Sequence, residues 1–304
     1  MGDVNALEFV GVDWGTSSFR AWLCEAESLP QQIHNSDQGM SRLNQDEFAP
    51  YLVQVLHDAG IEQTVPVIIC GMAGARDGWH EVPYVALPAT WKKIQRNAVQ
   101  LRAGPYHCFI LPGVCLSMDG RFDVMRGEET LLFGALSSGA PDGVFCLPGT
   151  HSKWCRIEDG KLVNWQTMMT GELFALLSTQ STLSKFCSNA QARFRDDPAF
   201  ECAVQEALSA PNSAIHKLFS IRARALLDPD VDHREFPSRL SGLLIGQEIA
   251  GIELDRTEPV ILIAGGDVRE AYDCALRLAG FEVIAIDPAT SSVAGLSLFA
   301  AGAQ

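Results

Sequence analysis

The sequence is short of positive charge and lacks the segments that would place it at a membrane. Lys and Arg number 23 against 37 Asp and Glu, which gives a formal net charge of −14. This balance argues against broad binding to nucleic acid or anionic lipid, although a local cluster of cations and backbone N–H groups can still bind an anion. No apolar run reaches membrane-spanning length, and Met1 to Asn5 show no signal-peptide pattern. We therefore expect a cytoplasmic protein with no nucleic-acid or membrane partner.

Several common motifs are also missing. The nine cysteines form no CxxC pair, and no His/Cys cluster has metal-ligand spacing. We therefore expect buried, reduced thiols with no metal or disulfide role. The sequence contains neither a G-x-x-x-x-G-K-[ST] loop nor a G-x-G-x-x-G segment after a strand. This excludes the two commonest nucleotide-binding loops.

The length and the order of elements predict two related domains. The 304 residues are 47% hydrophobic and 20% charged, as in ordinary globular proteins. Three strands followed by helix, strand, helix, strand and helix occur twice, so we expect an α/β fold of two duplicated domains with a cleft between them. The predicted strands are 7–12, 19–25, 32–36, 65–70, 106–111, 144–147, 153–158, 161–167, 260–264 and 281–286, and the predicted helices are 45–58, 91–101, 127–137, 268–279 and 291–299, with a longer helical insertion over about 171–251.

One turn occurs in both halves. An apolar strand runs into Asp13-Trp14-Gly15-Thr16-Ser17, and a second runs into Pro148-Gly149-Thr150-His151-Ser152. Glycine allows a tight turn and a close approach of the backbone, and threonine adds a hydroxyl beside backbone N–H groups, which suits a phosphate. The pair of turns predicts two domains that hold one polyphosphate.

Only the first turn carries a carboxylate. Asp13 precedes Gly15 by two residues, whereas Leu147 takes the matching place in the second turn. A carboxylate at this point can hold a hydrated Mg²⁺ against terminal phosphates. The alternative is an Asp that only stabilises its turn. The pairing of the turns favours the role in binding Mg²⁺.

Two acidic residues, Glu128 and Glu129, follow Gly127 at the start of the helix that joins the halves. Acidic residues in a first helical turn interact favourably with the helix dipole, so capping alone could explain them. A carboxylate near the cleft can also accept the proton of an attacking hydroxyl. Glu128 is our first candidate for this base and Glu129 the second.

Two glycine-containing loops follow strands at corresponding places in the halves. Gly265 and Gly266 precede a helix, where bare backbone can lie against a nucleotide base or ribose, or form a plain turn with Asp267 as N-cap. In the first half the loop begins with Gly71 and Met72. It continues with side chains that can hold a small polar molecule, namely Arg76, Trp79, Glu81 and Tyr84.

Four basic residues can contact a substrate or a phosphate. Arg20 or Arg76 can pair with a substrate carboxylate through two hydrogen bonds, or can simply be solvated. His151 and Ser152 do not form a nucleophilic pair, because neighbouring residues of a strand point to opposite faces. Contact with a phosphate or substrate is the better role for His151 and for Lys153.

These segments together resemble a known family. The duplicated fold is similar to the sugar kinase, Hsp70 and actin superfamily, with two ribonuclease H-like domains of the actin/hexokinase type. Within it, segments across nearly the whole chain resemble the 2-dehydro-3-deoxygalactonokinase family. The matching segments are 13–17, 20–22, 71–72, 79–84, 125–129, 148–154, 241–246 and 264–267.

The resemblance implies roles for particular residues. Asp13, Gly15, Thr16 and Ser17 match the first phosphate motif, Gly149 and Thr150 the second, and Gly265 and Gly266 the adenosine motif. Related carbohydrate kinases place the base Asp of a Gly-Asp pair where this sequence has Gly127-Glu128, so the base stays open among Glu128, Glu129 and Asp13. Gly71 and Met72 resemble the sugar-side loop.

The implied reaction transfers the γ-phosphate of ATP, with Mg²⁺, to the terminal hydroxyl of 2-dehydro-3-deoxy-D-galactonate in galactonate breakdown. We expect residues 1–126 to bind the sugar acid and residues 127–304 to bind the nucleotide, with the last helix able to pack back on the first domain. A kinase of another keto-deoxy acid, such as the gluconate epimer, and a non-kinase ATPase or phosphatase are the alternatives. The oligomeric state is open, with a homodimer as one alternative.

Overall fold

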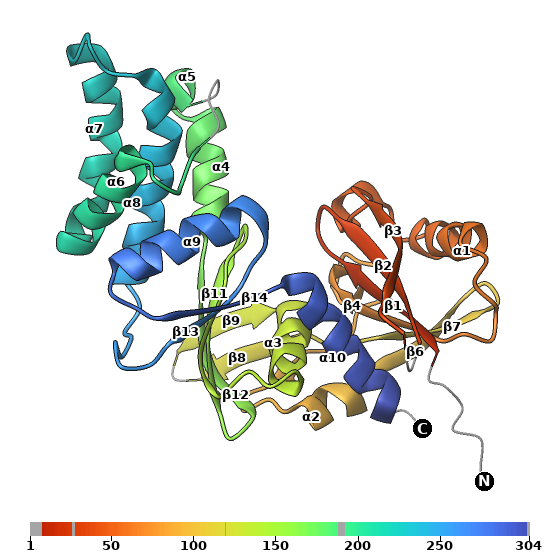
Figure 1. The fold of residues 1–304 in the computed structure, drawn as a ribbon. Helices are drawn as coiled ribbons and strands as arrows, with labels where there is room; N and C mark the ends of the chain where they lie inside the picture. Colours follow the sequence, from red (N-terminus) through yellow and green to blue (C-terminus); the bar gives the residue numbers. More distant parts are fainter. Residues whose placement is uncertain (1–7, 26–27, 119, 188–191, 303–304) are drawn as a thin grey trace. The chain divides into compact units, whose positions relative to one another are not determined.

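The computed structural model describes residues 8–25, 28–118, 120–187 and 192–302 (Figure 1). The chain divides into two compact units. Unit 1 consists of Met1–Asp142, Ile157–Asn164 and Pro288–Gln304, and unit 2 of Gly143–Arg156 and Trp165–Asp287. Of the features expected from sequence, Leu7 of the first strand, the N-terminal residues 1–5 and residues 188–191 of the insertion lie outside the described part.

Unit 1 is built on a six-stranded sheet with the order β3-β2-β1-β4-β7-β6. Its central strand β1 is buried along its whole length, as its apolar sequence predicts. β1 and β2 form an antiparallel hairpin, whereas β1 is parallel to β4, and β4 to β7. The carboxyl ends of β1 and β4 therefore meet at one edge of the sheet. The strands are β1 (Phe9–Trp14), β2 (Phe19–Cys24), β3 (Gln31–Ser36), β4 (Val67–Gly71), β6 (Val99–Ala103) and β7 (Tyr106–Ile110).

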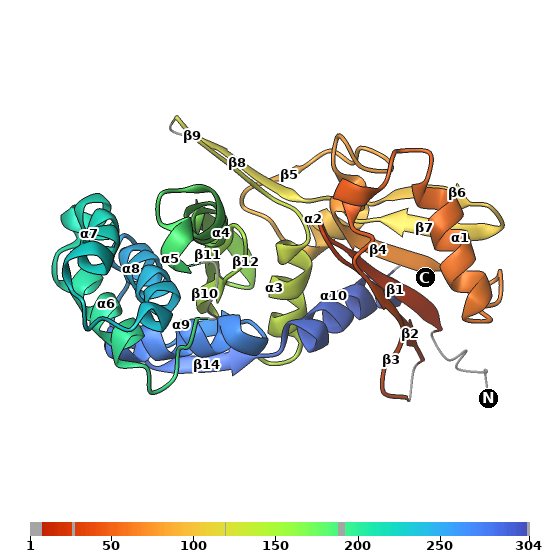
Figure 2. The same ribbon diagram turned by 90° about the horizontal axis from the view of Figure 1, so that it is seen from above.

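Helices cover both faces of this sheet. On one face, α1 (Phe48–Asp58) packs its buried side chains against Val12 and Trp14 of β1. On the other, α10 (Pro288–Gly302) packs Leu296 and its neighbours against β1 and β4. α3 (Glu128–Ser137) lies beside α10 in Figures 1 and 2. The last helix thus belongs to unit 1, because its apolar residues complete the core there.

Unit 1 also contains a small sheet of three strands that the sequence analysis did not predict. The order is β5-β8-β9, with β8 and β9 in a hairpin that Figure 2 shows extending from the unit. The helix predicted over 91–101 is shorter, because α2 (Trp91–Arg96) ends and its continuation alternates in burial as strand β6. The strands of the small sheet are β5 (Val85–Ala86), β8 (Val114–Met118) and β9 (Arg121–Met125).

The second sheet has the order β12-β11-β10-β13-β14 and belongs to unit 2, except for its residues 157–164, which are part of unit 1. This order matches β3-β2-β1-β4-β7 strand for strand, and β10, β13 and β14 are parallel. The expected duplication of an α/β fold is confirmed. The elements are β10 (Gly143–Leu147), β11 (Ser152–Glu158), β12 (Lys161–Met168), β13 (Val260–Ile263), α9 (Gly266–Leu278) and β14 (Val283–Ile286).

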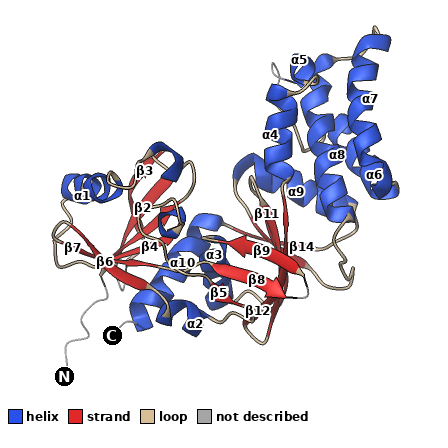
Figure 3. Cartoon of the chain, turned by 180° about the vertical axis from the view of Figure 1, so that it is seen from behind, coloured by secondary structure: helices blue, strands red, loops and turns tan. Residues whose placement is uncertain are grey.

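A bundle of helices forms the predicted insertion of unit 2 (Figure 3). α6 begins with Pro198 and is capped by the Asp197 carboxylate, as its sequence requires. α8 packs closely on α6 at Gly242, where an added Cβ would lie 2.5 Å from the Phe200 carbonyl oxygen. The helices are α4 (Thr170–Gln180), α5 (Ser184–Cys187), α6 (Pro198–Ser209), α7 (Ala214–Leu227) and α8 (Phe236–Ala250).

The sequence predicts a domain boundary after residue 126, whereas in the structure the first segment of unit 1 continues to Asp142. α3 begins at Glu128 but belongs to unit 1, where it packs on α10. Six of the nine cysteines are buried, five of them in strands and Cys187 in α5. In the described part of the chain, no helix combines the length and the apolar character needed to span a bilayer.

Candidate functional site

Asp13 is the last but one residue of β1, beside the first glycine turn, and pairs with Arg20 of β2. The antiparallel register puts the two residues opposite each other, and Arg20 Nη2 donates to Asp13 Oδ2 over 2.6 Å. The turn is closed by Gly15 N, which donates to the Ser18 carbonyl over 2.8 Å. Burial raises the pKa of the Asp13 carboxyl, and the Arg20 charge opposes this rise. Arg20 thus supports the ionised form of a carboxylate that is only 9% exposed.

Two glycines bring the start of α3 to this edge of the sheet. Gly71 at the end of β4 has φ +90°, and an added Cβ would lie 2.5 Å from the Trp14 carbonyl oxygen. Gly127 has φ +109°, and its Cβ would lie 3.2 Å from the Gly71 Cα. Side chains are excluded at both positions, so the three backbone segments approach closely. Glu128 consequently lies near enough to Asp13 for its charge to raise the Asp13 pKa further.

The two glutamates of α3 have different surroundings. Glu128 is half-buried, and its Oε2 accepts from Arg126 N over 3.0 Å. Glu129 is fully buried, and its Oε1 and Oε2 both lie within 2.9 Å of Gly127 N, which donates to them. Burial, and then the Glu128 charge, raise the pKa of Glu129 from 4.5 to about 8. Glu128 is therefore the more accessible base, whereas Glu129 secures the turn before the helix.

The raised pKa of Glu129 predicts a pH dependence of stability. The folded protein keeps this proton up to about pH 8, whereas the unfolded chain releases it near pH 4.5. Unfolding thus releases a proton within this window, and the free energy of unfolding falls as the pH rises through it. At about 1.4 kcal/mol per pH unit, the loss amounts to up to about 5 kcal/mol.

This loss is measurable by urea unfolding at pH 5, 7 and 9. The free energy of unfolding of the natural protein, relative to that of Glu129→Gln, is expected to decrease across the series, because the amide carries no titrating proton. A difference that stays constant with pH would show that Glu129 is ionised in the folded protein at all three values.

The loop after β4 places the predicted sugar-side residues in unequal positions. Met72 starts the short 3₁₀ helix η2 (Met72–Gly74) and is half-buried, whereas Arg76 and Glu81 are exposed. Trp79 is half-buried, with its ring centroid 6.5 Å from that of Trp14, so it also contributes to the core. Tyr84 remains 41% exposed.

Arg126 is a residue of this site to which the sequence analysis gave no role. It is only 7% exposed, its Nη2 donates to the Val82 carbonyl over 2.7 Å, and its guanidinium lies 4.3 Å from the centroid of the Tyr84 ring. Gly74 leaves room for it, since an added Cβ would lie 2.8 Å from Arg126 Nη1. Arg126 thus ties the loop after β4 to the start of α3. The sequence offers one sign of such a role, because Arg126 lies within the segment 125–129 that resembles the family.

In unit 2 the second glycine turn lies against the start of α4. Gly149 and Thr150 are exposed. A side chain at Gly171 would collide with the Gly149 carbonyl oxygen, and Glu172 N donates to the Thr150 carbonyl over 3.0 Å. The sequence gives no sign of this contact between the turn and α4. It brings the N-terminal backbone of a helix beside the predicted phosphate turn.

The basic residues after this turn have partners in the protein. His151 Nε2 lies 2.6 Å from Glu172 Oε2. Lys153 is 4% exposed, and its Nζ donates to the His151 carbonyl over 3.1 Å. Lys153 therefore fixes the shape of the turn. Direct contact of either residue with a ligand stays a prediction.

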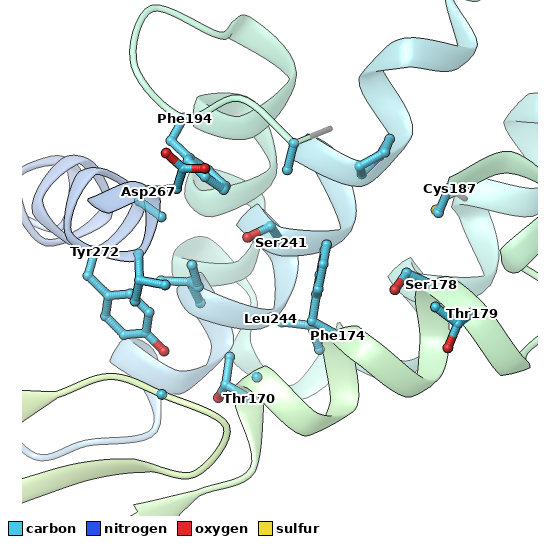
Figure 4. Close-up of a pocket in the computed structure, with 17 residues that line it drawn as sticks. Thr170, Phe174, Ser178, Thr179, Cys187, Phe194, Ser241, Leu244, Asp267 and Tyr272 are labelled. Carbon is cyan, nitrogen blue, oxygen red and sulfur yellow. The ribbon is translucent and has the colours of Figure 1, made fainter. Parts of the chain in front are cut away.

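A pocket of about 460 Å³ adjoins the second turn within unit 2 (Figure 4). Its walls come from α4, α8, α9 and the segment 192–194, and they are largely apolar. Gly149 lies at one side, and Asp267 near the start of α9 lies at another. Gly265 and Gly266 come directly before Asp267, and Gly266 has φ +53°. The lining includes Thr170, Phe174, Ser178, Phe194, Ser241, Leu244, Val268 and Tyr272.

The structure thus gathers the predicted residues into one group in each unit. Unit 1 brings together Asp13, Arg20, Gly71 and Glu128, and unit 2 brings the Gly149 turn beside the pocket at Asp267. Among the described residues, no three His, Cys, Asp or Glu side chains lie close enough to hold a metal ion by themselves. A metal at Asp13 would need further ligands from a bound molecule.

Comparisons with known proteins point to one family. The family model described as 2-keto-3-deoxy-galactonokinase matches residues 13–299. A Rhizobium meliloti protein named "Probable 2-dehydro-3-deoxygalactonokinase" is 37% identical over 292 residues, which cover 95% of either chain. The 2-dehydro-3-deoxygalactonokinase of Escherichia coli is 32% identical over 290 residues, covering 95% of this chain and 96% of that protein.

A solved structure shows the same fold. It is a crystal structure from Sinorhizobium meliloti, provisionally described as a 2-dehydro-3-deoxygalactonokinase, and superposes with a TM-score of 0.90 at 38% identity, covering 96% of this chain and 95% of the other. The family model spans both glycine turns, and both relatives cover 95% of the chain. The chain therefore belongs to the 2-keto-3-deoxy-galactonokinase family.

Proposed function

We propose that the protein transfers the γ-phosphate of ATP to the 6-hydroxyl of 2-dehydro-3-deoxy-D-galactonate, giving 2-dehydro-3-deoxy-6-phosphogalactonate in D-galactonate catabolism. The observation that carries this proposal is the pair of glycine turns on equivalent hairpins, one with a buried carboxylate and one without, in a chain of this kinase family. Such a metabolite kinase would work in the cytoplasm, where ATP is available.

The nucleotide fits unit 2. The apolar walls of the 460 Å³ pocket suit an adenine ring, and the exposed Gly149 and Thr150 at its side offer backbone N–H groups to phosphates. Asp267 near the start of α9 is placed to accept hydrogen bonds from a ribose. Transfer to the sugar acid requires the γ-phosphate to reach Asp13, so we propose that the Gly15 turn contacts the same triphosphate in the reacting state.

Asp13 suits a magnesium ion carried by ATP. Mg²⁺ keeps most of its waters and commonly binds proteins through one or two carboxylates together with substrate phosphates. The single carboxylate at the end of β1, with Glu128 nearby, matches this pattern, and the absence of a larger ligand cluster in the described residues agrees with it. The bound ion would neutralise charge on the phosphates during transfer.

Glu128 is our candidate for the base that receives the hydroxyl proton. It is half-buried beside Asp13, whereas both oxygens of Glu129 face Gly127 N in the interior. For the substrate carboxylate we favour Arg76, which is exposed on the sugar-side loop, over Arg20, whose Nη2 is committed to Asp13. Trp79, Glu81 and Met72 complete the proposed sugar-acid site.

An assay of ATP consumption with a panel of sugar acids tests the proposal. We expect turnover with 2-dehydro-3-deoxy-D-galactonate to exceed turnover with its gluconate epimer and with aldonic acids by at least about tenfold. Faster turnover with the gluconate epimer would show that the protein is a kinase of that sugar acid instead. ATP hydrolysis at equal rate with and without any sugar acid would indicate an ATPase or phosphatase instead.

A further inference from the structure

A buried carboxylate in unit 2 has no part in the reaction described above. Glu248 of α8 is 4% exposed, although charged side chains are rarely buried without a partner. Its Oε1 accepts from Trp154 Nε1 over 2.8 Å, and its Oε2 accepts from the Tyr272 hydroxyl over 2.9 Å. Thr170 donates a further hydrogen bond from its side chain. Within the described chain, these partners are all neutral.

The direction of the hydrogen bonds extends the network to a fifth residue. The Tyr272 hydroxyl donates to Glu248 Oε2, so its hydrogen points at Glu248. The Ser152 hydroxyl lies 2.9 Å from the Tyr272 oxygen and also forms a hydrogen bond with the Glu248 carboxyl. Ser152 is completely buried. One carboxylate therefore orients hydroxyl groups on three separate elements, β11, α4 and α9.

Each of these groups adjoins the proposed nucleotide site. Ser152 follows the second glycine turn directly, at the start of β11. Thr170 begins α4, whose next residue, Gly171, packs against the Gly149 carbonyl oxygen. Thr170 and Tyr272 both line the pocket, and Figure 4 shows their side chains close together at one end of it. The network connects the turn to two pocket walls.

Stability alone is a poor reason for this arrangement. Desolvation of a carboxylate with only neutral donors costs several kcal/mol, and apolar residues of similar volume often replace buried charges without loss. The hydrogen bonds to Glu248 instead fix the positions of the donor side chains relative to one another, because each bond has a preferred direction.

We propose that Glu248 is a positioning residue for the nucleotide. It holds the Gly149 turn, the first turn of α4 and the Tyr272 wall in the spacing that ATP requires. The inference rests on the proposed kinase function. It adds that ATP affinity, rather than sugar-acid affinity, depends on a group that touches neither substrate.

Calorimetric titration with ATP and steady-state kinetics test this on two variants of the full chain. Tyr272→Phe keeps the ring in the pocket wall but removes the hydroxyl that contacts both Glu248 and Ser152. Glu248→Gln keeps the volume and removes one acceptor. We expect the Kd and KM for ATP to rise about tenfold in either variant, equivalent to about 1.4 kcal/mol, with KM for the sugar acid changed less than twofold.

Glu206→Gln is the matched control. Glu206 of α6 accepts two hydrogen bonds of 2.8 Å from Arg239 Nη2 of α8, so this variant also loses a carboxylate contact on α8, at residues that do not line the pocket. The KM of the Glu206→Gln variant for ATP should equal that of the natural protein. If Tyr272→Phe and Glu248→Gln lower the melting temperature but bind ATP like the natural protein, Glu248 is only structural. If the natural protein itself binds no nucleotide, the proposed function fails as well.

Discussion

Substitution of Asp13 by Asn is expected to reduce kcat by about 10³-fold or more while the protein stays folded. Asn keeps the volume at the end of β1, and its carbonyl oxygen can still accept from Arg20 Nη2. It removes the only carboxylate of the two glycine turns, and with it the charge that we propose would hold the magnesium of ATP. The effect should appear in kcat at saturating ATP and sugar acid.

Asp228→Asn provides the control for this substitution. Asp228 also pairs with an arginine, Arg224, over 3.4 Å, but in an exposed pair at the end of α7. The Asp228→Asn variant should retain the kcat of the natural protein. Exposed ion pairs contribute little to stability, and this pair is not part of the proposed site. Near-natural kcat for Asp13→Asn, with a folded protein by circular dichroism, would refute the assigned role.

Substitution of Glu128 by Gln is expected to slow the chemical step by about 10²- to 10⁴-fold with little change in ATP affinity. The amide preserves the hydrogen bond from Arg126 N but cannot take up the hydroxyl proton. Single-turnover measurement of phosphoryl transfer, together with the Kd for ATP, separates this effect from a loss of binding.

The neighbouring Glu129→Gln variant shows whether the base is correctly assigned. Because Glu129 is fully buried and faces Gly127 N, its substitution should chiefly alter the pH dependence of stability. A larger loss of single-turnover rate in Glu129→Gln than in Glu128→Gln would move the base to Glu129.

Local sequence patterns predicted most of the fold. The hairpin of β1 and β2 follows from two apolar runs joined at Gly15, and the matching strand order of the second sheet follows from the repeat of that pattern. The sequence predicts a helix from Trp91 to Leu101, which runs past Arg96. Antiparallel pairing with β7 decides in favour of strand β6.

The site was predicted in part, for physical reasons. Asp13, Gly149 and Glu128 stand out because the same glycine turn follows an apolar strand in both halves and because two acidic residues open the helix after Gly127. The contact of Gly71 with Trp14 depends on a positive φ that a sequence does not reveal. The network around Glu248 joins residues from Ser152 to Tyr272, far apart in the chain, so only the folded protein brings them together.

A crystal structure with a non-hydrolysable ATP analogue, Mg²⁺ and 2-dehydro-3-deoxy-D-galactonate tests the central claim most directly. The account predicts one triphosphate in contact with both glycine turns, with the Asp13 carboxylate on the shell of its magnesium ion. A triphosphate bound away from either turn, or a magnesium ion with Asp13 out of reach, would contradict it.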